Sequence, residues 1–312
     1  MRRVERAHLR SGLTASAVLL GLAVGAPGSP APRPPRFEVA AIRGGDATPA
    51  ACREVLSTCK EPDLPGAAGR LAALASRCLR SPDRRLLLLT TRAAGTAAGA
   101  GEPAYVLGGP LPQPVAVGGG QFRIGAWAAW SPGGNRLAAV GSVGARAGEE
   151  RDQPFIIDPP SGALSAAGQV AGSAFLIAWC RGEAEVAVLA APHPEESGDL
   201  LTGDLYLGSA GAPAARRLST GEQLIGMACS PDGELLAAAD GAAIRILLYG
   251  ARRGDPRGEL RLAGAGGQGH LADRIKSIWW QSGSALAVVT GYFDGMAWSG
   301  ERTFVLKLSP PG

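Results

Sequence analysis

The sequence predicts an all-β protein assembled from five similar repeats of about 50 residues each. Three observations lead to this prediction. A short motif followed by an apolar run recurs along the chain at a nearly constant interval. Each repeat contains several short apolar runs separated by turn residues. The 312 residues are 46% hydrophobic and include 46 glycines and 24 prolines, as expected of a folded, turn-rich chain.

The recurring motif is clearest in two stretches. WSPGGNRLAAV at 130–140 matches CSPDGELLAAA at 229–239, and RSPDRRLLLL at 80–89 is a looser copy. Two further stretches, which begin at Trp179 and Trp280, lack the Ser-Pro pair but keep the first residue and the apolar run. We call the first residue of each copy its anchor. The anchors are Arg80, Trp130, Trp179, Cys229 and Trp280, at intervals of 50, 49, 50 and 51 residues.

Four short strands are expected in each repeat. A first apolar run reaches the anchor, a turn of the Ser-Pro-Asp-Gly type reverses the chain, and a second apolar run follows. A third run comes next, and then a fourth that is weaker and more polar, as expected of an outer edge strand. In the repeat anchored at Trp130 these runs are 124–130, 137–140, 155–157 and 163–166. Four antiparallel strands per repeat of this length are typical of a β-propeller blade, so we predict a five-bladed β-propeller.

The last repeat is one strand short, because only Ser-Pro-Pro-Gly follows its third run, Phe304–Leu308. Near the N-terminus, Phe37–Ile42 partly alternates apolar and polar residues and belongs to no complete repeat. We predict that Phe37–Ile42 pairs antiparallel with Phe304–Leu308 as the outermost strand of the last blade and closes the ring. A six-bladed ring, with a sixth blade built from residues 37–70, is the alternative.

The stretches that begin at Trp130 and Cys229 resemble the W-S-P-D-G-x-x-[LI]-A-[FV] core of the WD40-like repeats in TolB-type β-propellers, which are bacterial extracytoplasmic proteins. The resemblance extends over about residues 68–312. It implies a scaffold that binds other proteins.

The N-terminus has the features of an export segment. Four arginines within the first ten residues precede an apolar run at 13–26, and small residues lead into the proline-rich stretch 27–35. We therefore assign 1–26 as a signal peptide or an uncleaved N-terminal anchor, 27–35 as a linker and 36–312 as the propeller. We expect an exported, extracytoplasmic protein that is secreted, periplasmic or membrane-tethered, and that touches a membrane only through an uncleaved N-terminal segment.

Five cysteines fit an exported protein with one or two disulfides and one remaining thiol. The stretch from Thr48, which includes Cys52 and Cys59, favours a turn or two of helix, in which these two Cα atoms would lie roughly 10.5 Å apart, too far for a disulfide. Either that helix is broken or the partner lies elsewhere, with Cys78 the nearest candidate for a disulfide with Cys52. Cys180 and Cys229 are expected to be small buried apolar residues.

Charge and motifs argue against several functions. The net charge is +4, but residues 1–36 carry a surplus of +5 and leave −1 for the remainder. Without a concentrated basic face we expect no nucleic-acid binding, and Arg216-Arg217 and Arg252-Arg253 are interpreted as isolated basic pairs. The chain has no Gly-x-Ser-x-Gly elbow, no phosphate-binding Gly-Lys-Ser/Thr motif and no C-x-x-C pair, and its three histidines are isolated. We therefore expect no enzymatic activity, no cofactor and no metal.

One set of residues is a candidate binding site. Equivalent positions in a ring of repeats lie at the same height, so the positions seven residues before the anchors should surround one mouth of the channel. Charged residues occupy several of these positions, and we predict a binding site there, with ordinary solvated loop charge as the alternative. The candidate residues are Arg123, Glu222, Asp273 and the adjacent Arg274; Ala73 and Gly172 occupy the other two positions.

The function predicted from these observations is that of an exported, monomeric, non-enzymatic propeller. It presents a loop face to a protein partner of the cell envelope whose identity the sequence leaves open. The alternative is a propeller that binds a sugar or another small molecule, such as a degenerate glycoside hydrolase.

Overall fold

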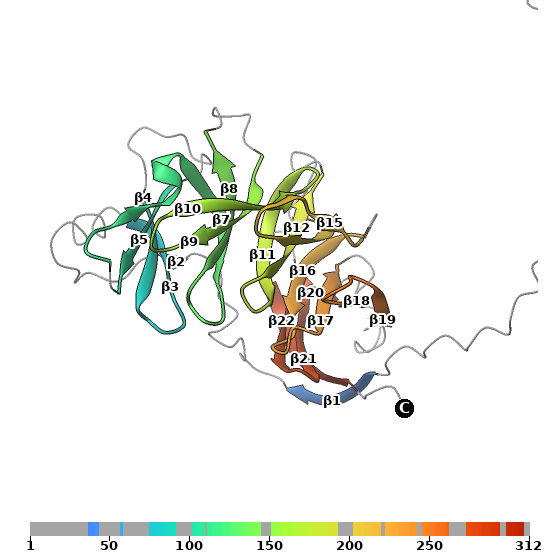
Figure 1. Cartoon of the computed structure of the whole chain (residues 1–312). Coiled ribbons are helices and arrows are strands. Elements are labelled where there is room, and N and C mark those ends of the chain that lie inside the picture. Colours follow the sequence, from blue (N-terminus) through green and yellow to red (C-terminus); the bar gives the residue numbers. More distant parts are fainter. Residues whose placement is uncertain are drawn as a thin grey trace, which may run out of the picture. The chain divides into compact units, whose positions relative to one another are not determined.

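The computed structural model describes residues 37–43, 57–58, 75–91, 102–109, 111–144, 151–192, 202–219, 222–241, 245–261, 273–293 and 298–308 (Figure 1). Every regular element in these ranges is a β-strand except a short 3-10 segment at Val117–Gly120. The predicted all-β class is therefore confirmed. The described ranges contain no helix with the length and apolar character needed to cross a membrane. The predicted signal peptide or anchor and the proline-rich linker lie outside them.

The predicted apolar runs form strands in all five repeats. Repeat 1 contains β3 (Ala75–Arg80), β4 (Leu86–Thr91), β5 (Glu102–Gly108) and β6 (Val115–Ala116). Repeat 2 contains β7 (Phe122–Trp130), β8 (Leu137–Val143), β9 (Gln153–Asp158) and β10 (Ala163–Gln169). Repeat 3 contains β11 (Ser173–Arg181), β12 (Glu185–Ala191), β13 (Asp204–Ser209), β14 (Ala212–Ala214) and β15 (Arg216–Arg217). Repeat 4 contains β16 (Leu224–Cys229), β17 (Leu235–Asp240), β18 (Arg245–Gly250) and β19 (Pro256–Arg261), and repeat 5 contains β20 (Asp273–Ser282), β21 (Ala285–Phe293) and β22 (Trp298–Leu308).

Within each repeat, successive strands pair antiparallel in chain order, except that in repeat 3 β13 pairs with β15 and β14 joins another sheet. Repeats 3, 4 and 5 each contribute to a separate four-stranded sheet. Repeats 1 and 2 belong to one larger sheet, because the start of β5 pairs with the start of β7, and β14 adds to the edge of β10 in parallel orientation. Each described sheet is an open row of strands with two edges.

The first strand of the chain, β1 (Phe37–Arg43), completes the sheet of repeat 5. It pairs antiparallel with β22, with Phe37 opposite Leu308 and Ile42 opposite Phe304. Figure 1 shows this strand in blue beside the red strands of the C-terminal repeat. The predicted pairing of Phe37–Ile42 with Phe304–Leu308 is confirmed.

The stretch predicted to be helical between Cys52 and Cys59 is extended where the structure describes it. Ser57 and Thr58 form β2, which pairs antiparallel with β3 opposite Cys78 and Arg77. The open edge of β3 offers unpaired backbone groups, which the passing chain satisfies better as a strand than as a helix. Cys52 and Cys59 lie outside the described residues, and Cys78 is disulfide-bonded.

The second strand of each repeat is buried on both of its faces, which explains why its sequence is an almost uninterrupted apolar run. In β17, Leu236 and Ala238 pack on the side of repeat 3, whereas Ala237 and Ala239 pack on the side of repeat 5. The alternation of side chains along a strand distributes consecutive residues to two different cores. We call the contact between two neighbouring repeats a joint.

Each of the four described joints has its own apolar core. Leu88, Phe122, Ile124 and Leu137 lie in the core of joint 1–2. Val140, Ile177 and Val188 lie in joint 2–3, Leu189, Leu205, Met227 and Leu236 in joint 3–4, and Ile246, Ile278, Leu286 and Phe304 in joint 4–5. Two smaller clusters cover the outer faces of the terminal repeats: Cys78, Leu87, Leu89 and Leu107 on repeat 1, and Trp279, Ala287 and Val289 on repeat 5.

The tryptophan anchors bind each repeat to the one before it. The indole nitrogen Nε1 of Trp130 donates a hydrogen bond to the carbonyl of Leu79 at 3.1 Å. Trp179 donates in the same way to Ala129 at 2.8 Å, and Trp280 to Ala228 at 3.0 Å. Each acceptor directly precedes the anchor of the preceding repeat. The tryptophans are therefore a repeated clasp, in which a largely buried indole N–H satisfies a carbonyl across the joint.

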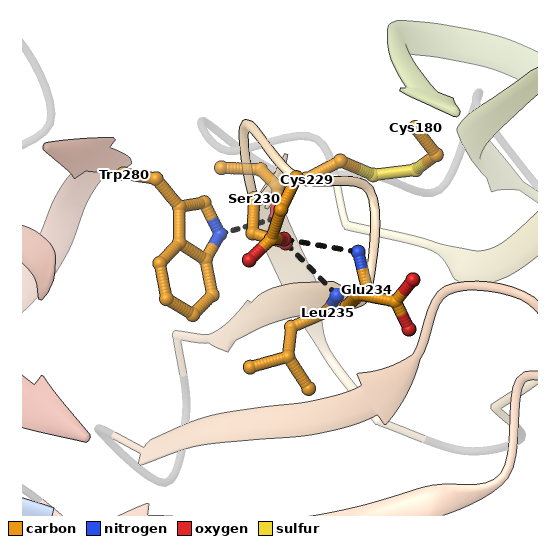
Figure 2. The surroundings of a disulfide bond; sticks show 8 residues. Cys180, Cys229, Ser230, Glu234, Leu235 and Trp280 are labelled. Carbon is orange, nitrogen blue, oxygen red and sulfur yellow. Dashed lines mark hydrogen bonds between the residues drawn. A yellow bond between two sulfur atoms is a disulfide. The ribbon is translucent and has the colours of Figure 1, made fainter. Parts of the chain in front are cut away.

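Joint 3–4 is held differently, because the anchor of repeat 4 is Cys229. Its sulfur is joined to Cys180 of repeat 3 in a disulfide with a Cα–Cα distance of 4.8 Å. Figure 2 shows this bond together with the Trp280 indole of the next joint. The interpretation of Cys180 and Cys229 as merely small buried apolar residues was wrong, because the packing of neighbouring repeats brings together two thiols that are 49 residues apart.

Deleting residues 37–42 should lower the free energy of unfolding by more than about 2 kcal/mol, because it removes the ladder of hydrogen bonds between β1 and β22. Urea unfolding of the two chains measures the change. Deletion of residues 27–35 is the matched control and should have a much smaller effect. Equal losses from the two deletions would contradict a structural role for β1.

Candidate functional site

The predicted mouth residues lie where the first strands of their repeats begin. Arg123 pairs with Ser142 and Asp273 with Tyr292, so the two residues occupy equivalent register positions in repeats 2 and 5. Arg274 is half-buried in β20, and the side chain of Asp273 lies outside the described residues. We call this end of the repeats the strand-start end.

These candidates make no contact with one another among the described interactions. Arg123 donates from Nη1 to the carbonyl of Gly120 at 3.4 Å, within its own repeat. Glu222 is half-buried, and its Oε2 atom is buried without a hydrogen-bond partner. Burial, and next the negative charge of Glu222, raise the pKa of Tyr249 to about 12. The register therefore gives these residues similar positions, whereas their contacts do not form one cluster.

Other carboxylates at the strand-start end are held in polar clusters that the repeat motif does not reveal. In repeat 1, Glu102 Oε2 accepts hydrogen bonds from Ser76, from Thr90 at 2.5 Å and from Arg77 Nε at 3.2 Å. Burial by itself would raise the pKa of Glu102, but the hydrogen bonds from Ser76 and Thr90 and the charge of Arg77 outweigh it and lower the pKa. The donors around Glu102 therefore favour the ionised form of its side chain.

Repeats 3 and 4 carry comparable clusters at the same end. Asp204 pairs with Arg217 in repeat 3. Arg245 of repeat 4 donates to Asp240 at 2.8 Å and to Glu259 at 3.0 Å. The hydrogen bond that Asp240 accepts is the main cause that raises the pKa of Arg245. Such ion pairs fix the starts of the third strands. Within the described ranges, no three His, Cys, Asp or Glu side chains are grouped so that they could hold a metal ion.

The opposite end of the repeats is formed by the turns between first and second strands, which we call the turn row. It comprises residues 81–85, 131–136, 181–184, 230–234 and 281–284. Three of these turns use a buried serine to close the hairpin. The backbone N–H of Leu86, Arg136 and Leu235 donates to the hydroxyl of Ser81, Ser131 and Ser230, respectively, at 2.9, 3.1 and 2.9 Å.

In repeats 1 and 4, the serine hydroxyl donates to the aspartate two residues later. The distances are 2.6 Å from Ser81 to Asp83 and 2.5 Å from Ser230 to Asp232. The hydrogen bond from Ser81 is the main cause that lowers the pKa of Asp83. The Ser-Pro-Asp sequence therefore forms a closed local network in these two turns.

The turn of repeat 2 completes the same network with a residue from repeat 3. Gly133 occupies the aspartate position, and the Ser131 hydroxyl donates instead to Glu183 at 2.9 Å. A Cβ atom at Gly133 would lie only 2.8 Å from Glu183 Oε1, so the missing side chain leaves room for this carboxylate. Arg136 adds a hydrogen bond to the carbonyl of Glu183 at 3.2 Å. The turns of repeats 2 and 3 are thus bonded directly to each other.

Exposed arginines stand along this row and near it. Arg84, Arg136 and Arg181 are exposed in the turns of repeats 1, 2 and 3. The basic pairs interpreted as isolated are brought together by the fold, because the guanidinium of Arg216 donates to the carbonyls of both Arg252 and Arg253. That contact is long-range, between the outer strand of repeat 3 and a turn of repeat 4, so spacing along the chain did not reveal it.

Glu183→Ala should destabilise the protein by about 1 kcal/mol, because the buried Ser131 hydroxyl loses its acceptor. Gly133→Asp alone should also destabilise, because the new carboxylate meets Glu183. The double variant should recover most of the loss, since an aspartate at 133 then plays the part of Asp83 and Asp232. Urea unfolding of the natural chain, the two single variants and the double variant gives the coupling energy between positions 133 and 183. Strictly additive losses of stability would contradict the contact between these two positions.

Glu102 should make stability depend on pH in the acidic range. Because its folded pKa lies below its unfolded value, the stabilisation is present above the unfolded pKa and is lost as pH falls through the folded pKa. The stability gap between the natural chain and Glu102→Gln should therefore shrink between neutral pH and about pH 3. Urea midpoints at both pH values measure it. A gap of constant size would show that Glu102 has no depressed pKa.

Comparisons with known proteins give no close relative. No family model matches the chain, and no curated protein matches it. Among solved structures, the chain is similar to the hydrazine synthase of Kuenenia stuttgartiensis at 13% identity, with a TM-score of 0.44 over 75% of this chain and 71% of that one.

Proposed function

We propose that this chain is an exported, non-enzymatic β-propeller of the WD40-like, TolB-type kind that binds a protein partner of the cell envelope through its turn row. The observation that carries the proposal is the direct bonding between the turns of repeats 2 and 3, in which Ser131 and Arg136 donate to Glu183. Turns that are fixed against each other lose little conformational entropy when a partner binds. A rigid row of charged turns is therefore suited to recognition.

The propeller assignment is supported by the order of strands and by the joints. Each repeat is a meander of antiparallel strands, and its second strand is packed between two neighbouring cores. The terminal repeats carry apolar clusters on their outer faces, which are suited to contact each other in a ring of five blades. The pairing of β1 with β22 supplies the fourth strand of the last blade.

The chemistry of the turn row favours a protein surface with carboxylates. Arg84, Arg136 and Arg181 are exposed and form no ion pair among the described interactions. Arginine is enriched at protein interfaces because its planar guanidinium binds carboxylates through two hydrogen bonds. The carboxylates of Asp83, Glu183 and Asp232 are already engaged by serines, so they hold the turns in place.

Export is supported by the Cys180–Cys229 disulfide. Disulfides persist in oxidising compartments and are uncommon in the reducing cytosol. The basic and apolar N-terminal segment supplies the signal or anchor that such a location requires.

The test is affinity capture from the native envelope fraction, in parallel with a glycan and metabolite binding screen. A variant with Arg84, Arg136 and Arg181 all changed to glutamine should lose at least about tenfold in partner affinity. The matched control places glutamate at Ser165, Ala166 and Gln169, three exposed positions of β10, and changes the net charge by the same amount. The control should bind as the natural chain does.

Two results would overturn the proposal. One is a protein partner whose binding is unaffected by the turn-row variant but abolished by the β10 control. The other is a sugar or small metabolite as the ligand found in the screen, with no protein captured, which would favour the small-molecule alternative.

A further inference from the structure

The four described joints differ in the chemistry of their clasp. Joints 1–2, 2–3 and 4–5 are fastened by an indole N–H that donates to a backbone carbonyl. Joint 3–4 has a covalent bond between Cys180 and Cys229 at the corresponding place. A hydrogen bond of this kind is insensitive to reductants, whereas a disulfide is cleaved by them. The clasp of joint 3–4 is therefore sensitive to reductants, whereas the clasps of the other three joints are not.

The two cysteines replace the two residues that build the ordinary clasp and turn. Cys229 stands at the anchor position, where repeats 2, 3 and 5 have tryptophan. Cys180 follows the anchor of repeat 3, at the position where Ser81, Ser131 and Ser230 close the turns of other repeats. Both departures from the motif fall in neighbouring repeats and face each other across one joint. Neither would hold the joint without the other.

The rest of joint 3–4 is not covalent. Its core contains Leu205, Met227 and Leu236, and the backbone N–H of Gly203 donates to the carbonyl of Leu224 at 3.0 Å at the strand-start end. At the turn row, the disulfide ties the first strand of repeat 3 to the first strand of repeat 4. Between the outer parts of the same two repeats, Arg216 donates to the carbonyls of Arg252 and Arg253. Cleavage of the disulfide leaves the apolar core and the Arg216 hydrogen bonds in place but removes the tie between the two first strands at the turn row.

We propose that the Cys180–Cys229 pair is a redox-controlled clasp that makes the attachment of repeats 4 and 5 to repeats 1–3 depend on oxidation. With the disulfide formed, the joint is closed along its length. With two thiols, the turn-row end of the joint opens and repeats 3 and 4 separate locally. This inference does not depend on the proposed binding function.

The chemistry of closing requires an oxidant of the disulfide class. A Cys180 or Cys229 thiolate attacks the disulfide of the oxidant, and a mixed disulfide forms as one thiolate of the oxidant leaves. The second cysteine then attacks the mixed disulfide, the S–S bond between Cys180 and Cys229 forms, and the second thiolate of the oxidant leaves. The pair gives up two protons and two electrons, and the oxidant departs as a dithiol.

The test compares backbone hydrogen exchange in the oxidised full-length chain and after treatment with dithiothreitol. Exchange in β11 and β16 should rise by at least about thirtyfold on reduction. Exchange in β7, at joint 1–2, should change little, because Trp130 holds that joint in either state. Peptide mapping of the oxidised chain should recover the Cys180–Cys229 linkage.

Two variants separate this disulfide from any other effect of the reductant. Cys180→Ser with Cys229→Ser should exchange at joint 3–4 like the reduced chain, with or without dithiothreitol. Cys180→Ser with Cys229→Trp restores the residues of the other repeats, so its indole is expected to donate to the carbonyl of Ala178 and to keep the joint closed in reductant. The proposal fails if reduction of the natural chain leaves exchange at β11 and β16 unchanged, or if the tryptophan variant is as open as the serine pair.

Discussion

The stability of this fold depends on the burial of each second strand on both faces. In β12, Val186 and Val188 belong to the core shared with repeat 2, and Ala187 and Leu189 to the core shared with repeat 4. An isolated repeat would expose both of these rows to water, so no repeat is stable without a neighbour. The joints therefore carry the stability of the protein, and the outer strands contribute mainly edges and surface.

The packing of each repeat against its neighbours also explains which residues can occupy the anchor position. A residue at the end of the first strand lies against the preceding repeat, where any buried donor must find an acceptor. Tryptophan meets this demand with one N–H group and a large apolar surface. Cysteine meets it by another route, since it has little surface to bury but can be bonded to a partner across the joint. Tryptophan and cysteine thus occupy the same structural position. A reductant cleaves the disulfide of the cysteine but does not affect the hydrogen bond of the indole.

The strands could be predicted from the sequence because the apolar runs that form them and the turn residues that separate them are both local features. The apolar runs that are buried on two faces, such as 186–189, need no knowledge of their neighbours to be recognised. The pairing of β1 was predictable because the last repeat lacks a strand. Ser57 and Thr58, just before Cys59, are a strand, which agrees with the alternative of a broken helix, because a sheet edge was available that local propensity does not include.

The contacts that define the candidate sites were harder to predict, because they cross between repeats. The acceptor for Ser131 comes from Glu183, and only the glycine at 133 marks its place. Cys180 and Cys229 were interpreted one at a time, although their register in adjacent repeats indicates a pair. Arg123 and Asp273 share a register position, but register does not determine contact, and Arg123, Glu222 and Arg274 do not meet in any described interaction.

The pairing of β1 with β22 also has a consequence for the order in which the chain can mature. Phe37 is among the first residues of the fold to be synthesised, and its partner Leu308 is among the last. Contacts between such distant residues form late, because nearly the whole chain must be present before they can form. Until then β1 is an unpaired strand whose backbone groups are open to any other strand that it meets. The interval between synthesis of the first strand and arrival of the last is therefore the period in which this protein most needs protection from aggregation.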